Sequence, residues 1–579
     1  MTYGIFGGTR PLVGVEFLLV GIALFVAILA PNSILRLLTP CEQFFCKAAR
    51  RPWLALLLAA GAPLVLRGLI LPLYPLPSPS VNDDYSNLLQ ASTFAAGRAT
   101  NPTPPFWQHF ESIFIFCTPT YNSQYQPGPG LFLAAGKILA GHPWWGVYGG
   151  MGLLFGTLCW ALGQSIPWRW ALLGSLLAAM QFGVFGYWMN SYSSGAVPGI
   201  GGALVFGGLV RTRQRREGWA AALIAIGLVF LAASRPFEAV LWGIGAVLFL
   251  APAKLSFRTL VPGGLLLIAG AGALLWYNWR VTGNAFEPPY LHNLKLYGTP
   301  QPFFWQPPVR IASFRHAELR DIYLFQKHFY DQRASFSGLL RGMARRLADA
   351  WLFFVGPVLL LPLLWIPALW KDKRVRVWLV VIVLFLIDHL TFHRWYPLHS
   401  APEAILFCLI LVECWRRLRL LQFHRKPVGL ATTQLLLVCG CLSLLIPIAG
   451  RAVQPYLPPS AKGISVLWRP QFQTDTPRNQ IIRELNNLGG KHLIFVHYRP
   501  DHSPHVEWVY NGADISGSRI IWSRQVNRAS DQALAAYFHD HKPWILDADS
   551  DPPHLVPFDQ VGPESSLADP RPDSKAPAL

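Results

Sequence analysis

The sequence predicts an α-helical, multi-pass membrane protein, and three observations lead to this fold class. Of the 579 residues, 52% are hydrophobic and only 14% are charged, which is unusually apolar for a soluble chain. Apolar runs of about 20 residues, the length that crosses a bilayer, recur along the chain. Tryptophan stands at the ends of several of these runs, as in the aromatic belts of membrane interfaces.

Length and hydropathy predict about twelve spans. Their expected bounds are 12–38, 53–74, 145–162, 168–189, 196–210, 219–233, 237–250, 260–277, 351–370, 375–390, 398–415 and 430–448. The first run is too long for the apolar core of a cleavable signal, so we expect a retained helix. The shorter apolar run 128–141 is expected to lie at the membrane interface or to re-enter the membrane.

Lysine and arginine cluster in short segments between the expected spans, at 47–51, 211–216, 254–258, 371–376 and 416–426. With these spans, all the clusters fall on one side, which the positive-inside rule makes cytoplasmic. Topology therefore explains the net charge of +19, and nucleic-acid binding is not indicated. We expect an inner-membrane protein whose large loops, 75–126 and 278–350, face the extracytoplasmic (periplasmic) side.

The chain is expected to divide into a transmembrane domain, residues 1–450, and a small extracytoplasmic α/β domain, residues 451–551. In the second part, residues 476–489 and 530–541 have helical patterns, and residues 491–498, 519–524 and 542–549 have strand patterns. The tail 552–579 is rich in Pro, Asp and Ser, and we expect it to be disordered. The eight cysteines show neither a disulfide framework nor a zinc-ribbon spacing.

An acidic pair, Asp83-Asp84, follows the second expected span and opens the stretch DDYSNLLQASTFAAGR. Neighbouring carboxyl groups close to lipid raise each other's proton affinity, which suits a general base, and carboxylates also bind divalent cations. In the alternative interpretation, Asn82, Asp83 and Asp84 cap the following helix and complement its dipole. The two interpretations are compatible. The apolar residues of the stretch share one face, so its helix could lie flat on the membrane surface.

The order of these features resembles the GT-C superfamily of membrane glycosyltransferases, in particular the protein O-mannosyltransferases and the aminoarabinose transferases of lipid A. An apolar span, the acidic pair, an amphipathic outer helix, an aromatic-rich loop and then YQPGPGLFL follow one another up to residue 141. In that family an outer-loop Asp, usually in an Asp-Glu pair, is the base towards the acceptor, and a polyprenyl-phosphate sugar is the donor. The resemblance therefore implies Asp83 as the base and Asp84 as a supporting carboxylate. Gln126-Pro127 departs from the Lys-Pro or Pro-Pro that the family often has, which leaves the donor contact there open.

Three further residues of the first outer loop are candidates for substrate binding. His109 and Glu111, in WQHFE, are a second acid, a metal ligand or acceptor contacts in one interpretation, and part of a solvated loop in the other. Tyr125 belongs to the YQPGPG segment that carries the resemblance. If a divalent metal ion takes part, Asp83, Asp84 and Glu111 are the expected oxygen ligands.

Polar residues near the outer ends of later spans are candidates for holding a lipid phosphate. Arg235 and Glu238, in SRPFEAV, stand between two spans, where an Arg can hold a phosphate or can pair with the Glu to close a turn. Arg394, with Tyr396 and His399 in DHLTFHRWYPLH, suits a phosphate or pyrophosphate. The resemblance implies donor-phosphate contacts at the outer ends of late spans, and Arg394 is the residue that we carry over.

Two other features have a simpler alternative. His389 and His393 are spaced so that one helical face could present both to a metal ion, but no third ligand is evident. Lys137 is a lone cation in an interfacial apolar run, where it contacts substrate or simply snorkels to a lipid headgroup.

We weigh three functions. The first is an inverting glycosyltransferase that moves a sugar from a polyprenyl-phosphate donor to a hydroxyl of a lipid, glycan or protein acceptor, with Asp83 as general base. The second is a transporter or flippase of lipid-linked glycans, and the third is a polymerase or ligase of surface polysaccharide. The ionisable residues gather at the outer membrane edge rather than at mid-bilayer, which favours an enzyme over a transporter.

Overall fold

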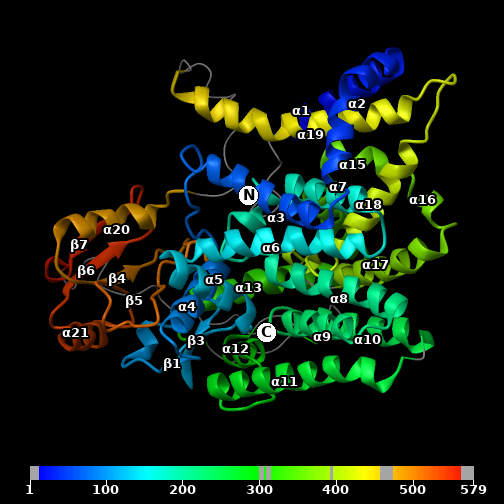
Figure 1. Cartoon of the computed structure of the whole chain (residues 1–579). Helices are drawn as coiled ribbons and strands as arrows, with labels where there is room; N and C mark the ends of the chain where they lie inside the picture. The colour runs from blue at the N-terminus through cyan, green and yellow to red at the C-terminus, as the bar shows by residue number, and fades with distance from the viewer. Residues whose placement is uncertain are drawn as a thin grey trace.

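The computed structural model describes residues 12–253, 255–298, 306–307, 314–391, 395–456 and 474–561. Figure 1 shows a bundle of long helices with a small sheet and its two helices packed at one end. The helices of the bundle and its loops are α1 (Val13–Leu29), α2 (Pro31–Ala48), α3 (Pro52–Leu69), α4 (Asn82–Ala95), α5 (Pro127–Ala140), α6 (Trp144–Gly163), α7 (Trp168–Ala178), α8 (Ala196–Arg215), α9 (Gly218–Ala232), α10 (Pro236–Leu250), α11 (Phe257–Thr282), α12 (Pro289–Tyr297), α13 (Ala317–Asp331), α14 (Phe336–Phe354), α15 (Gly356–Leu363), α16 (Ile366–Leu369), α17 (Lys373–Thr391), α18 (Ala404–Leu418) and α19 (Val428–Val453).

Within the described residues, five helices are long and apolar enough to cross a membrane, and up to seven spans result if each of two bent pairs counts as one. The five are Pro52–Leu69, Trp144–Gly163, Pro236–Ala253, Phe257–Thr282 and Val428–Tyr456. The chain is therefore a multi-pass helical membrane protein, as the sequence predicted. The predicted number of about twelve spans is not confirmed.

Two spans that the sequence predicted as continuous are bent. The span expected at 12–38 divides at Ala30, where α1 and α2 meet at 110°, because Pro31 lacks an N–H and its ring blocks a continuous helix. The span expected at 351–370 divides after α14, which meets α15 at 101°. Gly356 has a φ of 61° at this bend, a backbone conformation that glycine adopts without a steric penalty.

Other predicted spans are shorter or less regular than their apolar runs. Helix α18 has 15 residues, which is too short to cross about 30 Å of hydrocarbon by itself. It is also buried along most of its length. Helix α7 ends at Ala178 and passes into a π-helical turn, Ala179–Gly183. Helix α8 ends in a basic run that includes Arg213 and Arg215. Sequence hydropathy does not distinguish such protein-buried helices from lipid-facing spans.

The first outer loop is folded rather than extended over the membrane. It contains α4 and a small antiparallel sheet of order β1-β3-β2, formed by β1 (Asn101–Pro102), β2 (Ile115–Phe116) and β3 (Thr120–Ser123). Several polar residues of α4 are buried in protein, and the expectation that the helix lies flat on the membrane stays a prediction. The Ser86 hydroxyl donates to the Phe114 carbonyl at 2.7 Å, and the Asn87 amide donates to the Ser193 hydroxyl at 3.1 Å.

The C-terminal segment, residues 474–561, contains a four-stranded sheet of order β5-β4-β6-β7. Its elements are α20 (Pro477–Leu488), β4 (His492–His497), β5 (Ile520–Arg524), α21 (Arg528–Tyr537), β6 (Lys542–Asp547) and β7 (His554–Pro557). Strand β4 is parallel to β5 and β6, and β7 is antiparallel to β6. The predicted helices and strands of this segment are therefore confirmed. The expected disorder after residue 552 is wrong for β7, while residues 562–579 lie outside the described part of the chain.

The two helices of the C-terminal segment cover opposite faces of its sheet. Leu485 of α20 packs in one cluster with Val496, whereas Leu534 of α21 packs in another with Phe495. The second cluster also contains Leu89 and other residues of the first outer loop. One apolar core therefore joins the C-terminal segment to the loop that carries the acidic pair.

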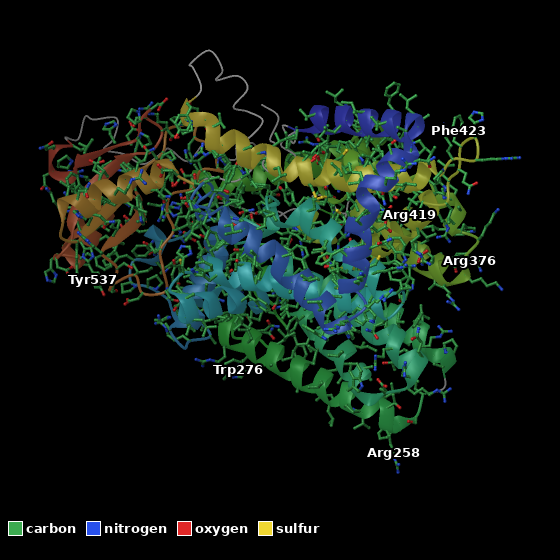
Figure 2. All side chains as sticks on the ribbon, turned by 45° about the horizontal axis from the view of Figure 1, so that its top comes forward. Arg258, Trp276, Arg376, Arg419, Phe423 and Tyr537 are labelled. Atoms are coloured by element: carbon green, nitrogen blue, oxygen red, sulfur yellow. The ribbon has the colours of Figure 1, made fainter. Side chains whose placement is uncertain are left out.

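Basic residues of the expected loops lie at the end of the bundle far from the C-terminal segment. Figure 2 shows Arg376 and Arg419 at the end far from Tyr537 of α21, with Arg258 at the corresponding end of α11. Arg419 pairs with Glu42 of α2 at 2.6 Å, which attaches the surface helix α2 to that end. This separation agrees with the predicted placement of the basic loops on one side of the membrane.

Candidate functional site

Helix α4 carries the acidic pair in its first turn. Its N-cap is Val81, which makes no side-chain capping bond, and Asp83 and Asp84 follow within the first turn. Capping by Asn82, Asp83 or Asp84 is therefore not found. Negative charges in a first turn still complement the helix dipole, but the two carboxyl groups have different surroundings and different partners.

Asp84 is fully buried and bound by backbone amides. Its Oδ1 accepts a hydrogen bond from the Tyr192 N–H at 2.9 Å, and its Oδ2 accepts one from the Ser80 N–H at 3.2 Å. Burial raises the pKa of Asp84 to about 7, although these amides favour the ionised form. The carboxyl group thus joins α4 to the segment between α3 and α4, which contains Ser80, and to the segment before α8, which contains Tyr192. It has no surface left for a substrate.

Asp83 is only half-buried, and the hydroxyl of Tyr125 donates a hydrogen bond to its Oδ1. Tyr125 lies directly before α5, whose N-cap is Gln126. The Gln90 side chain of α4 donates to the Tyr125 carbonyl at 2.9 Å, which fixes the loop against α4. The predicted site residues Asp83 and Tyr125 are therefore neighbours, and a carboxylate with one oriented partner remains within reach of a ligand.

The C-terminal segment covers the same part of α4. Tyr85 stacks on Tyr510 with ring centroids 4.2 Å apart, and the guanidinium of Arg478 lies 5.2 Å from the Tyr85 ring. The Asn82 amide donates to the Pro504 carbonyl at 3.2 Å. Residues more than 390 positions away in the sequence thus position the helix that carries Asp83.

Arg235 stands at the N-terminus of α10, close to the start of α5. The Gly128 N–H donates to the Ala233 carbonyl at 2.7 Å, so the loop after Tyr125 contacts the turn before Arg235. The Nη2 atom of Arg235 is buried without a hydrogen-bond partner among the described residues. The alternative of an Arg–Glu pair closing this turn is not found in the described part of the chain, because Arg235 and Glu238 form no ion pair there.

Glu238, in the first turn of α10, belongs to a buried polar cluster with the end of α17 and the turn before α18, where it acts electrostatically on Asp388 and His389. His389 binds the Glu403 carboxylate through Nε2, and its Nδ1 lies 3.5 Å from Asp388 Oδ2. Arg346 of α14 donates to the carbonyl of His389 at 3.3 Å. Glu403 was not among the predicted site residues, because a single Glu between two apolar runs carries no pattern.

His109 and Glu111 lie in contacts between parts of the protein. The ring nitrogens of His109 lie 2.8 Å from the Arg524 carbonyl and 2.8 Å from the Ser530 hydroxyl, and the ring is fully buried. Burial lowers the pKa of His109 to about 4. Glu111 accepts a hydrogen bond from Tyr297 at 2.9 Å and pairs with Arg315 at 3.0 Å. The side chains of His109 and Glu111 are engaged in these contacts and are not available to a substrate beside Asp83.

The remaining candidates are spread over the molecule. Lys137 is exposed on α5, as snorkelling requires. Tyr396 and His399 contact each other with ring centroids 5.9 Å apart at the turn before α18. His393 and Arg394 lie outside the described residues, so the metal and phosphate hypotheses that name them stay predictions.

The expected metal ligands are not brought together. Among the described residues, no group of three His, Cys, Asp or Glu side chains is placed to hold a metal ion. Asp84 is occupied by backbone amides and Glu111 by Arg315 and Tyr297. The structure therefore does not bring Asp83, Asp84 and Glu111 together as one set of metal ligands.

The site thus belongs to a multi-pass helical membrane protein with a carboxylate at the end of the bundle opposite its basic loops. No family model and no curated protein matches the chain. The crystal structure of ArnT from Cupriavidus metallidurans bound to undecaprenyl phosphate is similar over 76% of this chain and 82% of that chain, with 12% identity and a TM-score of 0.43. The Archaeoglobus fulgidus oligosaccharyltransferase in the apo form is similar over 86% of this chain and 69% of that chain, with 11% identity and a TM-score of 0.36. Both TM-scores are below 0.5, so neither similarity carries an argument about function.

Proposed function

We propose that this protein is a membrane glycosyltransferase of the GT-C type, which transfers a sugar from a polyprenyl-phosphate donor to an acceptor hydroxyl on the extracytoplasmic face. The observation that carries the proposal is that the two carboxyl groups of the acidic pair have different surroundings. Asp83 is half-buried beside the Tyr125 hydroxyl, while Asp84 is buried and bound by two backbone amides. The Asp84 carboxyl group holds α4 in place, and the Asp83 carboxylate remains accessible for catalysis.

In this proposal Asp83 accepts the proton of the acceptor hydroxyl as the acceptor oxygen bonds to C1 of the sugar. The bond from C1 to the phosphate oxygen breaks at the same time, and the electron pair leaves with the polyprenyl phosphate. Attack opposite the leaving group inverts the configuration at C1. Tyr125 orients the carboxylate, as the hydrogen bond from its hydroxyl to Asp83 supports.

The leaving phosphate needs a cation at the membrane edge, and Arg235 suits that role. Its buried Nη2 has no hydrogen-bond partner among the described residues, and a buried guanidinium N–H without a partner is costly. The turn that carries it contacts the start of α5, which follows Tyr125. A phosphate oxygen would supply the missing acceptor.

The direct test uses purified protein in lipid nanodiscs with a panel of polyprenyl-phosphate sugars and acceptor lipids or glycans, and measures release of polyprenyl phosphate. We expect one donor to be consumed, and Asp83→Asn to reduce turnover about 100-fold or more. The matched control is Asp372→Asn, because Asp372 also stands at a helix N-terminus but lies at the basic end, where its Oδ1 accepts from the Arg374 N–H at 3.0 Å.

Near-normal turnover in Asp83→Asn would remove Asp83 as the base. A flippase gives a different result, since it moves the intact donor between leaflets without consuming it. Donor translocation without release of polyprenyl phosphate would therefore contradict the proposal as a whole.

A further inference from the structure

The sheet of the C-terminal segment has a topological switch point between β4 and β6. Strand β4 lies in the middle, β5 pairs on one side and β6 pairs on the other, all three parallel. Along the chain, β4 is followed by β5 on one side, and the connection after β5 then crosses to β6 on the other side. In open parallel sheets, ligands bind outside the carboxyl ends of the strands at such a point.

A continuous polar network occupies the carboxyl ends of these two strands. The Arg499 Nη2 lies 2.6 Å from Asp547 Oδ2, and the Arg499 N–H donates to Asp549 Oδ2 at 2.9 Å. The other oxygen of Asp549 lies 2.6 Å from His502 Nδ1. The loop after β4 and the end of β6 are therefore joined at the place where the topology predicts a ligand.

Two atoms of this network are buried without a partner. Asp547 Oδ1 and His502 Nε2 make no hydrogen bond among the described residues, although Asp547 is only 4% and His502 only 6% exposed. Buried polar atoms are almost always paired, and an unpaired one costs about 1–3 kcal/mol. Two such atoms in one network indicate that a ligand completes it.

The chemistry of the two atoms defines the ligand. In the neutral imidazole whose Nδ1 donates to Asp549, His502 Nε2 is an acceptor, and Asp547 Oδ1 is also an acceptor. Both therefore require donors. Among the described residues there is no metal-holding group of three side chains, and the Arg499 guanidinium already supplies a positive charge beside Asp547. A neutral ligand with several hydroxyl groups fits best.

Access to the network is provided by Arg499. Its side chain is 48% exposed, whereas that of Asp547 beneath it is 5% exposed. An exposed guanidinium that makes one ion pair is held weakly, so it can turn aside and give a hydroxyl group access to Asp547.

We propose that the carboxyl edge of β4 and β6 is a saccharide-binding site, separate from the site at Asp83. It does not depend on the proposed transferase activity. The loop that leaves this site runs from His502 to Pro504, whose carbonyl accepts from Asn82 of α4, and on to Tyr510, which stacks on Tyr85. A saccharide bound here therefore lies on the loop that packs against the helix of Asp83, where a glycan acceptor would have its neighbouring sugar units.

The test is binding of methyl hexopyranosides and cellobiose, measured by isothermal titration calorimetry on the full chain in nanodiscs without lipid donor. Maltoside detergents are avoided, because their headgroup is itself a saccharide. We expect a Kd of about 1 mM or below for at least one ligand. Asp547→Asn and His502→Phe should each weaken binding about tenfold or more, since each removes an acceptor.

The matched control is Asp540→Asn, at the other end of β6, where Asp540 pairs with Lys491 at 2.7 Å. It should bind as the unaltered chain does. Absence of binding to the unaltered chain, or equal binding by all three variants, would overturn the proposal, as would binding of methylammonium with no binding of any saccharide. Unfolding temperatures identify a variant that fails to fold, in which case the other variant decides. Because no donor is present, the result is independent of the glycosyltransferase proposal.

Discussion

Asp83 and Asp84 are adjacent in the chain but bind different partners. The hydroxyl of Tyr125 reaches Asp83, and backbone amides of Ser80 and Tyr192 reach Asp84. The sequence predicted the pair, and it predicted Tyr125 as a site residue through the family resemblance. It could not predict Ser80 or Tyr192 as partners, because both contact Asp84 through backbone N–H groups, which every residue except proline carries. Which acid would be exposed depended on packing that no local pattern contains.

Burial of Asp84 makes the stability of the protein depend on pH. Its pKa is raised to about 7 in the folded protein, against about 3.9 in an unfolded chain. Between these values the folded state binds more protons, so the free energy of unfolding falls as the pH rises from about 4 towards about 7. Asp84→Asn removes this contribution, and its unfolding temperature should fall less between about pH 5 and about pH 8 than that of the unaltered chain.

The measurement is thermal unfolding of both proteins across that pH range, and the difference between them isolates Asp84 from other titrating groups such as His109. Turnover of Asp84→Asn should fall less than that of Asp83→Asn, because Asp84 positions α4 without touching substrate. Parallel pH curves for the two proteins would mean that Asp84 stays ionised at neutral pH.

Arg235 should control use of the lipid donor. Arg235→Ala is expected to raise the apparent KM for the donor, lower kcat, or both, because contacts to the phosphate strengthen as negative charge develops. Arg235→Lys should recover only part, since lysine lacks the planar fork of the guanidinium. Steady-state kinetics with varied donor checks this. Unchanged kinetics in both variants would indicate that the donor phosphate binds elsewhere, with Arg394 and Lys137 as the next cations to test.

Elements were predicted well where their pattern is local. The strands of the C-terminal segment alternate or run apolar between turn residues, and they were found where expected. Helix α4 was predicted as a helix and is found, and its place on the membrane surface stays a prediction. Its polar residues are satisfied by segments far away in the chain, such as Asn82 by Pro504, and amphipathicity alone does not reveal such partners.

Arg524, at the end of β5, joins three elements around α4. It pairs with Glu507, lies 3.0 Å from Glu318 of α13, and donates to the Glu111 carbonyl at 2.7 Å. Although burial alone would lower the pKa of Arg524, the two glutamates raise it above its usual value. The ion pairs thus replace the hydration that the buried guanidinium has lost.

Arg524→Ala should destabilise the protein by about 3–5 kcal/mol, because it leaves Glu507 and Glu318 buried without their cation. Chemical denaturation monitored by tryptophan fluorescence measures the change. The control is Arg483→Ala, which removes an exposed pair with Asp475 and should change stability little. Similar losses in the two variants would show that the buried network does not hold the segments together.

At the scale of the whole molecule, the basic residues and the candidate site lie at opposite ends of the bundle. Arg376 and Arg419 mark one end and Tyr537 of α21 the other (Figure 2). The number of spans was not predictable from hydropathy, because helices such as α18 are apolar for burial in protein rather than in lipid. The separation of charge was predictable, since it depends on where the loops are and not on how many spans lie between them.

Labelling of intact cells should reveal the orientation. A cysteine introduced as Tyr537→Cys, at a position 48% exposed, should react with a membrane-impermeant maleimide added from outside. The native Cys41, exposed on α2, should react only after the membrane is opened, because α2 is attached to the basic end through Glu42. The reverse pattern would place Asp83 on the cytoplasmic side and would remove a periplasmic acceptor from consideration.

The core shared by the first outer loop and the C-terminal segment also sets an order of events during biosynthesis. Helix α4 leaves the ribosome early, but its partner Pro504 follows 422 residues after Asn82. At about 5–20 residues per second, the interval is on the order of half a minute or more. Throughout that time the chain can insert in the membrane while α4 still lacks the surface that covers it. A nascent chain therefore holds the acidic pair without its finished surroundings, and the site is completed only when the segment around Pro504 has been made.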